Sequence, residues 1–215
     1  VGFHDLNISS LEEKFLIFNL HSYTPLNTWL FFYKEPEELY KHRRNVNEYV
    51  RKNVKVKEEI IKKVDLFYKK YFTEYMIGAH VRGTDKKSES YIGQRPFVIL
   101  EDYITQIDLV LKREPNATIF IASDSNEAIK EIINRFPKNN IVVNKCTRMQ
   151  KYLGPIPLHL SSFAGPLAGE EALIDCLLLS KCDHVICTDS NLSAAALYFN
   201  PETSCTFVNQ HIGKK

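Results

Sequence analysis

From about residue 75 to its end, this chain alternates short apolar runs with helical patterns, and this alternation constrains the fold more than any other feature. Strands are predicted over residues 75–81, 117–122, 140–143, 184–187 and 205–208. Between them, apolar side chains recur at helical spacing over 100–110, 129–136 and 172–180. Strands and helices in alternation predict right-handed crossovers and a mainly parallel sheet. The strands are apolar throughout, which is typical of a sheet covered by helices on both faces. We therefore expect a Rossmann-like α/β fold.

Residues 1–74 have a different character, rich in aromatic and charged side chains with no strand alternation. A basic helix is predicted over 35–52, followed by an amphipathic helix whose apolar residues fall between 60 and 71. We divide the chain into a helical N-terminal region, 1–74, and a Rossmann-like domain, 75–215. The basic run 41–44 could contact a phosphate or an acidic partner, but a solvated helix face is the commoner explanation for such a run. Prolines and glycines over 147–169 predict a long loop.

The bulk composition excludes several classes of protein. A net charge of +2 gives no reason to expect nucleic acid as a partner. No apolar run approaches the length that crosses a bilayer. The five cysteines show neither a CxxC motif nor a Cys/His metal spacing, so we expect buried free thiols and no metal site. Unpaired thiols favour a reducing compartment and hence the cytoplasm, with the Golgi or endoplasmic reticulum lumen as the alternative if an N-terminal anchor has been removed.

The most polar strand end follows the first predicted strand, in the sequence His80-Val81-Arg82-Gly83-Thr84-Asp85-Lys86. Open parallel sheets bind their ligands at the carboxyl ends of the strands. Alternation along a strand puts His80 and Arg82 on one face, and the forked guanidinium of Arg82 suits phosphate oxygens. An ion pair between Arg82 and Asp85 is the structural alternative.

Three further polar stretches should reach the same edge of the sheet. Asp124 follows the second strand, and with Glu127 it has the spacing of a capping box, which alone accounts for it. Asp175 is an isolated carboxylate in an apolar helix and needs a partner when buried: the N–H groups of a guanine edge, a cap or a lysine. The fourth predicted strand leads into hydroxyl-bearing residues and a helix over 188–193, which indicates either a phosphate site or ordinary N-capping by Ser190 or Asn191.

Together these stretches supply an arginine, a helix N-terminus and two carboxylates at one crevice, as a nucleoside diphosphate requires. The chain has no GxGxxG and no GxxxxGK[ST] sequence, so neither a dinucleotide site nor a P-loop is predicted. No Asp-x-Asp pair follows a strand, so we expect no metal to hold the diphosphate.

The four stretches resemble the motif regions of the α-1,6-fucosyltransferases and protein O-fucosyltransferases over about residues 75–210. The resemblance implies a two-lobed GT-B-like enzyme whose Rossmann-like lobe binds GDP-fucose without a metal, and residues 1–74 would then be a remnant or a part of the acceptor lobe. Fucose would pass with inversion to a hydroxyl of a glycan or glycoconjugate, or of a protein. The alternatives are an inverting glycosyltransferase for another nucleotide sugar and a non-catalytic nucleotide- or glycan-binding module. The resemblance assigns the donor residues as follows: Arg82 to the β-phosphate, His80 and Asp175 to guanine, Thr188, Ser190 and Asn191 to the diphosphate, and Asp124 to support of the site.

The resemblance also implies a catalytic segment just after Arg82. Asp85 and Lys86 would shape the acceptor region, and Glu89 is the candidate base that deprotonates the acceptor hydroxyl. Two positions depart from the family pattern. Gly83 stands where the α-1,6 enzymes commonly have a second arginine, and Asp189 stands where an uncharged residue is usual.

Overall fold

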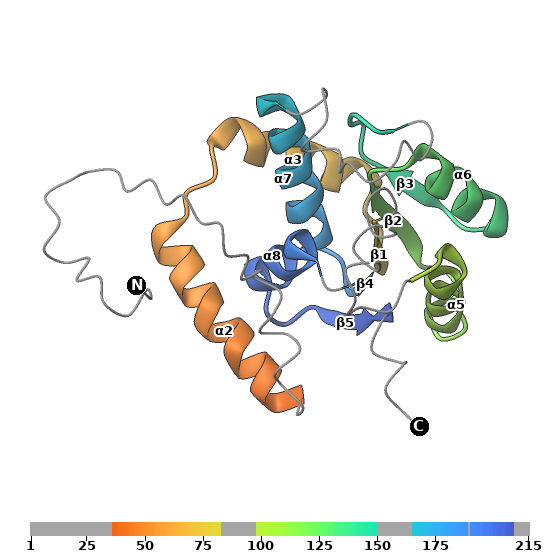
Figure 1. Cartoon of the computed structure of the whole chain (residues 1–215), viewed down its shortest axis with the longest axis horizontal. Coiled ribbons are helices and arrows are strands. Elements are labelled where there is room, and N and C mark those ends of the chain that lie inside the picture. Colours follow the sequence, from red (N-terminus) through yellow and green to blue (C-terminus); the bar gives the residue numbers. More distant parts are fainter. Residues whose placement is uncertain (1–35, 83–97, 150–164, 189, 209–215) are drawn as a thin grey trace, which may run out of the picture.

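The described part of this computed structural model comprises residues 36–82, 98–149, 165–188 and 190–208, and it is built around one parallel β-sheet (Figure 1). The strands lie in the order β3-β2-β1-β4-β5, and every neighbouring pair is parallel. Their bounds are β1 (Met76–Val81), β2 (Thr118–Ser123), β3 (Ile141–Val143), β4 (His184–Cys187) and β5 (Ser204–Phe207). Each predicted apolar run overlaps one of these strands, to within one residue at either end, so the α/β prediction is confirmed.

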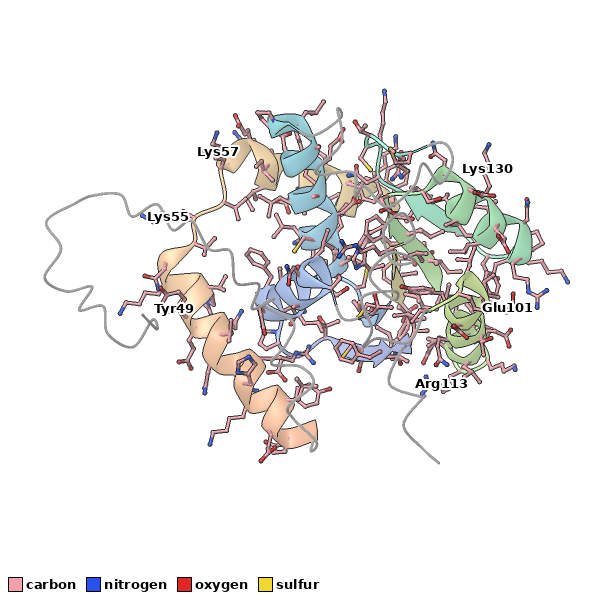
Figure 2. All side chains as sticks on the ribbon, viewed as in Figure 1. Tyr49, Lys55, Lys57, Glu101, Arg113 and Lys130 are labelled. Atoms are coloured by element: carbon pink, nitrogen blue, oxygen red, sulfur yellow. The ribbon has the colours of Figure 1, made fainter. Side chains whose placement is uncertain are left out.

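Helices cover both faces of the sheet, as the continuous apolar strands require. The helices α5 (Leu100–Leu111) and α6 (Asn126–Arg135) pack on one face, and α3 (Glu58–Tyr71), α7 (Pro166–Leu179) and α8 (Asn191–Phe199) pack on the other. A further helix, α2 (Pro36–Asn53), lies against α8 (Figure 1). Charged side chains such as Lys55, Lys57 and Lys130 extend outward from this body (Figure 2).

The two faces of β1 contribute to different hydrophobic clusters. Ile77, Ala79 and Val81 belong to the cluster beneath α5 and α6, whereas Met76 belongs to the cluster beneath α3, α7 and α8. Because side chains alternate along a strand, His80 lies on the same side as Met76. This places His80 under the helices that precede and follow β4.

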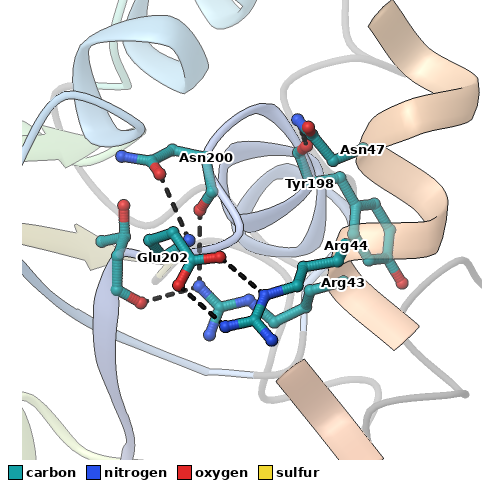
Figure 3. Close-up of polar contacts among 7 residues, drawn as sticks. Arg43, Arg44, Asn47, Tyr198, Asn200 and Glu202 are labelled. Atoms are coloured by element: carbon teal, nitrogen blue, oxygen red, sulfur yellow. Dashed lines mark hydrogen bonds and ion pairs between the residues drawn. The ribbon is translucent and has the colours of Figure 1, made fainter. Parts of the chain in front are cut away.

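Helix α2 is fixed to the sheet domain by an arginine from the basic run 41–44. Arg43 is fully buried, and its Nη2 donates hydrogen bonds to the carbonyl oxygens of Thr203, at 2.7 Å, and Asn200, at 3.4 Å (Figure 3). Arg44 forms an exposed ion pair with Glu202 at 2.8 Å. The expected solvated face is therefore wrong at Arg43, because the segment between α8 and β5 presents carbonyl groups that this side chain satisfies.

The predicted loop over 147–169 is also wrong at its end, since α7 begins at Pro166. Proline suits the first position of a helix, where its missing N–H has no intrahelical partner to lose. Gly165 precedes it with extended backbone, at φ 170°. Residues 150–164 lie outside the described part of the chain.

Candidate functional site

The order of the strands defines where a ligand would bind. The chain runs from β1 outward through β2 to β3, then returns to β4 on the other side of β1 and continues to β5. The two neighbours β1 and β4 therefore form a topological switch point, and in open α/β sheets the crevice at the carboxyl ends of such strands holds the ligand. Ile77 pairs with His184, and Ala79 with Ile186, so the two strands leave the sheet at the same edge.

Arg82 and the N-terminus of α8 meet this edge from adjacent strands. Arg82 directly follows β1 and is partly buried, while Thr188 follows β4 and α8 begins at Asn191. The first and fourth polar stretches of the sequence are thus neighbours in the fold. An arginine at the end of one strand and a helix N-terminus after the adjacent strand form an arrangement suited to a phosphate-bearing ligand.

Ser190 forms the N-cap of α8. Its Oγ accepts the backbone N–H of Ser193 at 3.1 Å, and its own backbone is extended, at φ −127°. Asn191 occupies the first helical position and is exposed, whereas the Thr188 side chain is buried and its hydroxyl lies 3.4 Å from the hydroxyl of Tyr103 on α5. N-capping by Ser190 and the presentation of a helix N-terminus are therefore compatible, since one hydroxyl satisfies only one of the first N–H groups.

His80 contacts two hydroxyl groups of the same helix N-terminus. Its Nδ1 lies 2.6 Å from Ser193 Oγ and 3.2 Å from Ser190 Oγ, and the two serine oxygens are 3.0 Å apart. All three side chains are buried. Sequence reasoning missed Ser193; its only signal was its position three residues after the predicted cap.

Asp175 lies in α7, on the same face of the sheet as His80, with only 6% of its surface exposed. Its Oδ1 accepts a hydrogen bond from Asn144 Nδ2 at 2.9 Å, and its Oδ2 contacts the thiol of Cys146 at 3.9 Å. Burial raises the pKa of Asp175 to about 6, although the Asn144 hydrogen bond and the charge of Arg148 act in the opposite direction. The sequence suggested a cap or a lysine as the structural partner of this carboxylate, and neither is found among the described residues. The side-chain amide of Asn144 is the partner instead.

Arg148 holds the segment that carries these partners against the edge of the sheet. Its guanidinium donates to the carbonyl oxygens of Ser123, at 3.0 Å, Asn144, at 2.6 Å, and Cys146, at 3.3 Å. Nearby, Glu171 Oε2 accepts the backbone N–H of residue 147 at 2.8 Å. Sequence reasoning missed Asn144 and Arg148 because neither lies in a recognisable motif.

The second polar stretch is organised differently from the prediction. Ser125, not Asp124, caps α6, because its Oγ accepts the N–H of Ala128 at 3.3 Å. The expected capping box of Asp124 and Glu127 is therefore wrong. Asp124 follows β2 at the carboxyl edge, where its carbonyl accepts the N–H of Met149 at 2.9 Å. Asp85, Lys86 and Glu89, with Gly83 and Asp189, lie outside the described residues.

Within the described ranges, no group of three or more His, Cys, Asp or Glu side chains is placed to hold a metal ion. None of the five cysteines, all of which belong to the described part of the chain, forms a disulfide, and three of them, Cys176, Cys182 and Cys187, are buried. Burial raises the pKa of Cys176 to about 12, so this thiol stays protonated. Among the helices that are described, none has the length and apolar character needed to span a membrane.

Fold and site together define a Rossmann-like α/β protein with a polar rim, formed by Arg82, Thr188, Ser190 and Asn191, at its switch point. No family model and no curated protein matches the chain. Among solved structures, POFUT1 in complex with GDP-fucose is similar with a TM-score of 0.51 and 10% identity, over 70% of this chain and 46% of that chain. NodZ alpha-1,6-fucosyltransferase co-crystallized with GDP has a TM-score of 0.45 and 22% identity, over 70% of this chain and 43% of that chain. NodZ from Bradyrhizobium has a TM-score of 0.45 and 17% identity, over 80% and 60%.

The similarity to POFUT1 shows that this chain shares the fold of a fucosyltransferase structure, which confirms the expected resemblance at the level of fold. The chain spans roughly half the length of the solved structures it matches.

Proposed function

We propose that this chain contains the GDP-fucose-binding lobe of a fucosyltransferase that transfers L-fucose, with inversion and without a metal, to a sugar or protein hydroxyl. The observation that carries the proposal is that Arg82 follows β1 and the N-terminus of α8 follows β4, at the switch point between these two adjacent strands. The shared fold with a structure that holds GDP-fucose supports it.

In this proposal the diphosphate lies across the ends of β1 and β4. The guanidinium of Arg82 binds the β-phosphate, and the first N–H groups of α8, with Ser190 and Asn191, bind the remaining phosphate oxygens. Because the Thr188 hydroxyl already contacts Tyr103, we assign Thr188 a backbone contact rather than a side-chain one.

The guanine base would lie on the face of the sheet that carries His80 and Asp175. An ionised carboxylate accepts hydrogen bonds only, and guanine presents two adjacent N–H donors on one edge. Adenine and uracil lack that pair, so Asp175 is the residue that would select the base. Asp124, at the end of β2, would support the site from the neighbouring strand.

The chemistry proposed for the transfer follows from the same placement. The acceptor oxygen forms a bond to the anomeric carbon of fucose, the bond from that carbon to the β-phosphate oxygen breaks, and GDP leaves. Arg82 stabilises the negative charge that develops on the departing diphosphate. Glu89 takes the proton of the acceptor hydroxyl, and Asp85 and Lys86 shape the acceptor side, as the family resemblance implies.

Ligand-dependent thermal stability tests the donor assignment. At a hundredfold excess over its dissociation constant, a ligand stabilises the folded state by about 2.7 kcal/mol. For a protein of this size that corresponds to a rise in melting temperature of about 5–10 °C. We expect this rise with GDP and not with UDP or ADP. A rise with UDP alone would instead support a glycosyltransferase for another nucleotide sugar.

Two substitutions of Arg82 then test its role. Arg82→Ala and Arg82→Lys should abolish turnover of GDP-fucose without unfolding the protein, because lysine cannot reproduce the fork. Arg135→Ala is the matched control, since Arg135 ends α6 on the far side of the sheet, where it is exposed. Wild-type turnover in Arg82→Ala would refute the proposal. A protein that binds GDP but never consumes GDP-fucose would be a binding module.

Metal independence has its own test. Turnover of GDP-fucose should be the same with and without EDTA, because Arg82 and the helix N-terminus supply the positive charge. Loss of turnover in EDTA that Mg²⁺ or Mn²⁺ restores would contradict this part of the proposal.

A further inference from the structure

The orientation of the His80 ring is fixed, because the hydroxyl groups of two buried serines at the N-terminus of α8 contact one of its nitrogens. The three polar atoms form a triangle: Ser190 Oγ lies 3.0 Å from Ser193 Oγ, Ser193 Oγ lies 2.6 Å from His80 Nδ1, and Ser190 Oγ lies 3.2 Å from His80 Nδ1. Ser193 has no exposed surface and Ser190 has 1%. Hydroxyl protons at such a depth need acceptors, because water cannot reach them.

Counting the protons of this cluster distinguishes two arrangements. In the first, Ser190 donates to Ser193, and Ser193 donates to His80 Nδ1, so both hydroxyl protons are used within the cluster. In the second, Nδ1 carries the proton and donates to Ser193, which donates to Ser190. Ser190 Oγ already accepts the backbone N–H of Ser193, and its own proton then has no acceptor in the cluster.

We propose that Ser193 is a positioning residue that, together with Ser190, holds His80 as the neutral tautomer with its proton on Nε2. Nε2 of the ring is then a fixed N–H donor. Such a donor suits an acceptor oxygen of a nucleotide, whereas a ring with its proton on Nδ1 would present an acceptor there. The nucleotide part of this inference rests on the proposed function, but the tautomer of the ligand-free protein does not.

Nitrogen NMR of the ¹⁵N-histidine-labelled protein measures the tautomer directly. The His80 signals among the seven histidines are assigned by their loss in His80→Gln. We expect Nδ1 to resonate as an unprotonated acceptor nitrogen and Nε2 as a protonated one, in the absence of any ligand. A proton on Nδ1, or protons on both nitrogens, would overturn the inference.

Ser193→Ala then tests which residue sets the tautomer. Alanine fits wherever serine does and favours the helix, so α8 should persist. The nearest donor to Nδ1 is lost, while Ser190 Oγ, 3.2 Å from Nδ1, remains as a longer and weaker donor. We therefore expect the two nitrogen signals to move part of the way toward each other, and to move further in Ser190→Ala/Ser193→Ala, where both donors are lost. Ser180→Ala is the matched control: it removes a buried hydroxyl that bonds a backbone carbonyl at 2.7 Å, at the C-terminal end of α7. Unchanged signals in Ser190→Ala/Ser193→Ala would overturn the inference.

Calorimetric titration with GDP links the tautomer to binding. Ser193→Ala should weaken GDP binding about 5- to 10-fold, the effect of one impaired hydrogen bond, whereas Ser180→Ala should not. Wild-type affinity in Ser193→Ala would refute the positioning role. Failure of the wild-type protein to bind GDP would refute the proposed function, and the tautomer measured without ligand would still decide the inference about Ser193.

Discussion

Replacing Asp175 with asparagine should make the protein more stable at neutral pH. This carboxyl group is 6% exposed, and burial raises its pKa from an ordinary 3.8 to about 6. The folded state therefore binds the proton of Asp175 about a hundredfold more tightly than the unfolded state does. Each factor of ten is worth about 1.4 kcal/mol, so holding the ionised form in the fold costs about 3 kcal/mol.

The sign of the pH dependence follows from the same two values. Between about pH 4 and pH 6 the folded protein holds a proton that the unfolded chain has lost, so the contribution of Asp175 to the free energy of unfolding falls as the pH rises. Above about pH 6 the carboxyl group is ionised in both states, and the full cost of holding its charge in the fold applies. An asparagine at this position carries no charge at any pH, and its side-chain oxygen can still accept the hydrogen bond that Asn144 Nδ2 donates.

Urea unfolding of wild type and Asp175→Asn at pH 4, 5, 6 and 7.5 measures this difference. We expect Asp175→Asn to raise the free energy of unfolding by about 1–3 kcal/mol at pH 7.5, and to have little effect near pH 4. Asp108→Asn is the control, because Asp108 is an exposed partner of Lys112 at 2.8 Å. Its effect should stay below about 1 kcal/mol at every pH. A loss of stability in Asp175→Asn that is equal at all four pH values would refute the reasoning.

The same substitution should impair GDP binding. Asparagine offers one donor and one acceptor where a carboxylate offers two acceptors, so one guanine N–H would face another N–H. We expect GDP affinity to fall at least about tenfold at pH 7.5, as measured by calorimetric titration. Wild-type affinity should also fall below about pH 6, where Asp175 takes up its proton. Unchanged affinity in Asp175→Asn would remove this residue from the proposed site.

Urea unfolding also tests two features of the fold. Arg43→Ala should cost about 2–4 kcal/mol, because it leaves the carbonyl groups of Asn200 and Thr203, between α8 and β5, without this donor. Arg44→Ala, which removes an exposed ion pair, should cost less than about 1 kcal/mol, and equal losses in the two variants would contradict this. Gly78→Ala should cost about 1–3 kcal/mol, since its new Cβ would lie 2.9 Å from the Sγ of Cys182. Gly169→Ala meets no atom within 4 Å and lies inside α7, so it should add about 0.5–1 kcal/mol, and a loss there would be evidence against it.

The sheet could be predicted because its strands are apolar along their whole length. Each run had to be buried on both faces, and only a parallel sheet with helices on both sides offers that to five short strands. The basic run 41–44 could not be interpreted in the same way. Its charges are visible in the sequence, but the carbonyl groups that accept the hydrogen bonds of Arg43 belong to residues about 160 positions later. The start of α7 was missed because Pro166 was taken as a loop residue, although proline is equally at home at the start of a helix.

The polar rim, too, could be predicted only in part. Which strand ends carry Arg82 and Thr188 follows from the order of elements, since parallel strands leave the sheet at one edge. Which side chains then touch each other does not follow, because such contacts depend on how a helix lies across the sheet. Asn144, which follows β3, reaches Asp175 only because α7 packs over β1 and β2, and no spacing in the sequence encodes that crossing.

Asp175 shows what a missing partner can reveal. One amide and one thiol hold this carboxylate, and they leave its pKa well above the ordinary value, so the fold alone gives no reason to keep a negative charge there. A neutral asparagine would satisfy the same neighbours at a lower cost. The charge is useful only if something else donates hydrogen bonds to it, and it lies on the face of the sheet that also carries His80. A ligand with two adjacent N–H groups would turn this destabilising residue into a selective one.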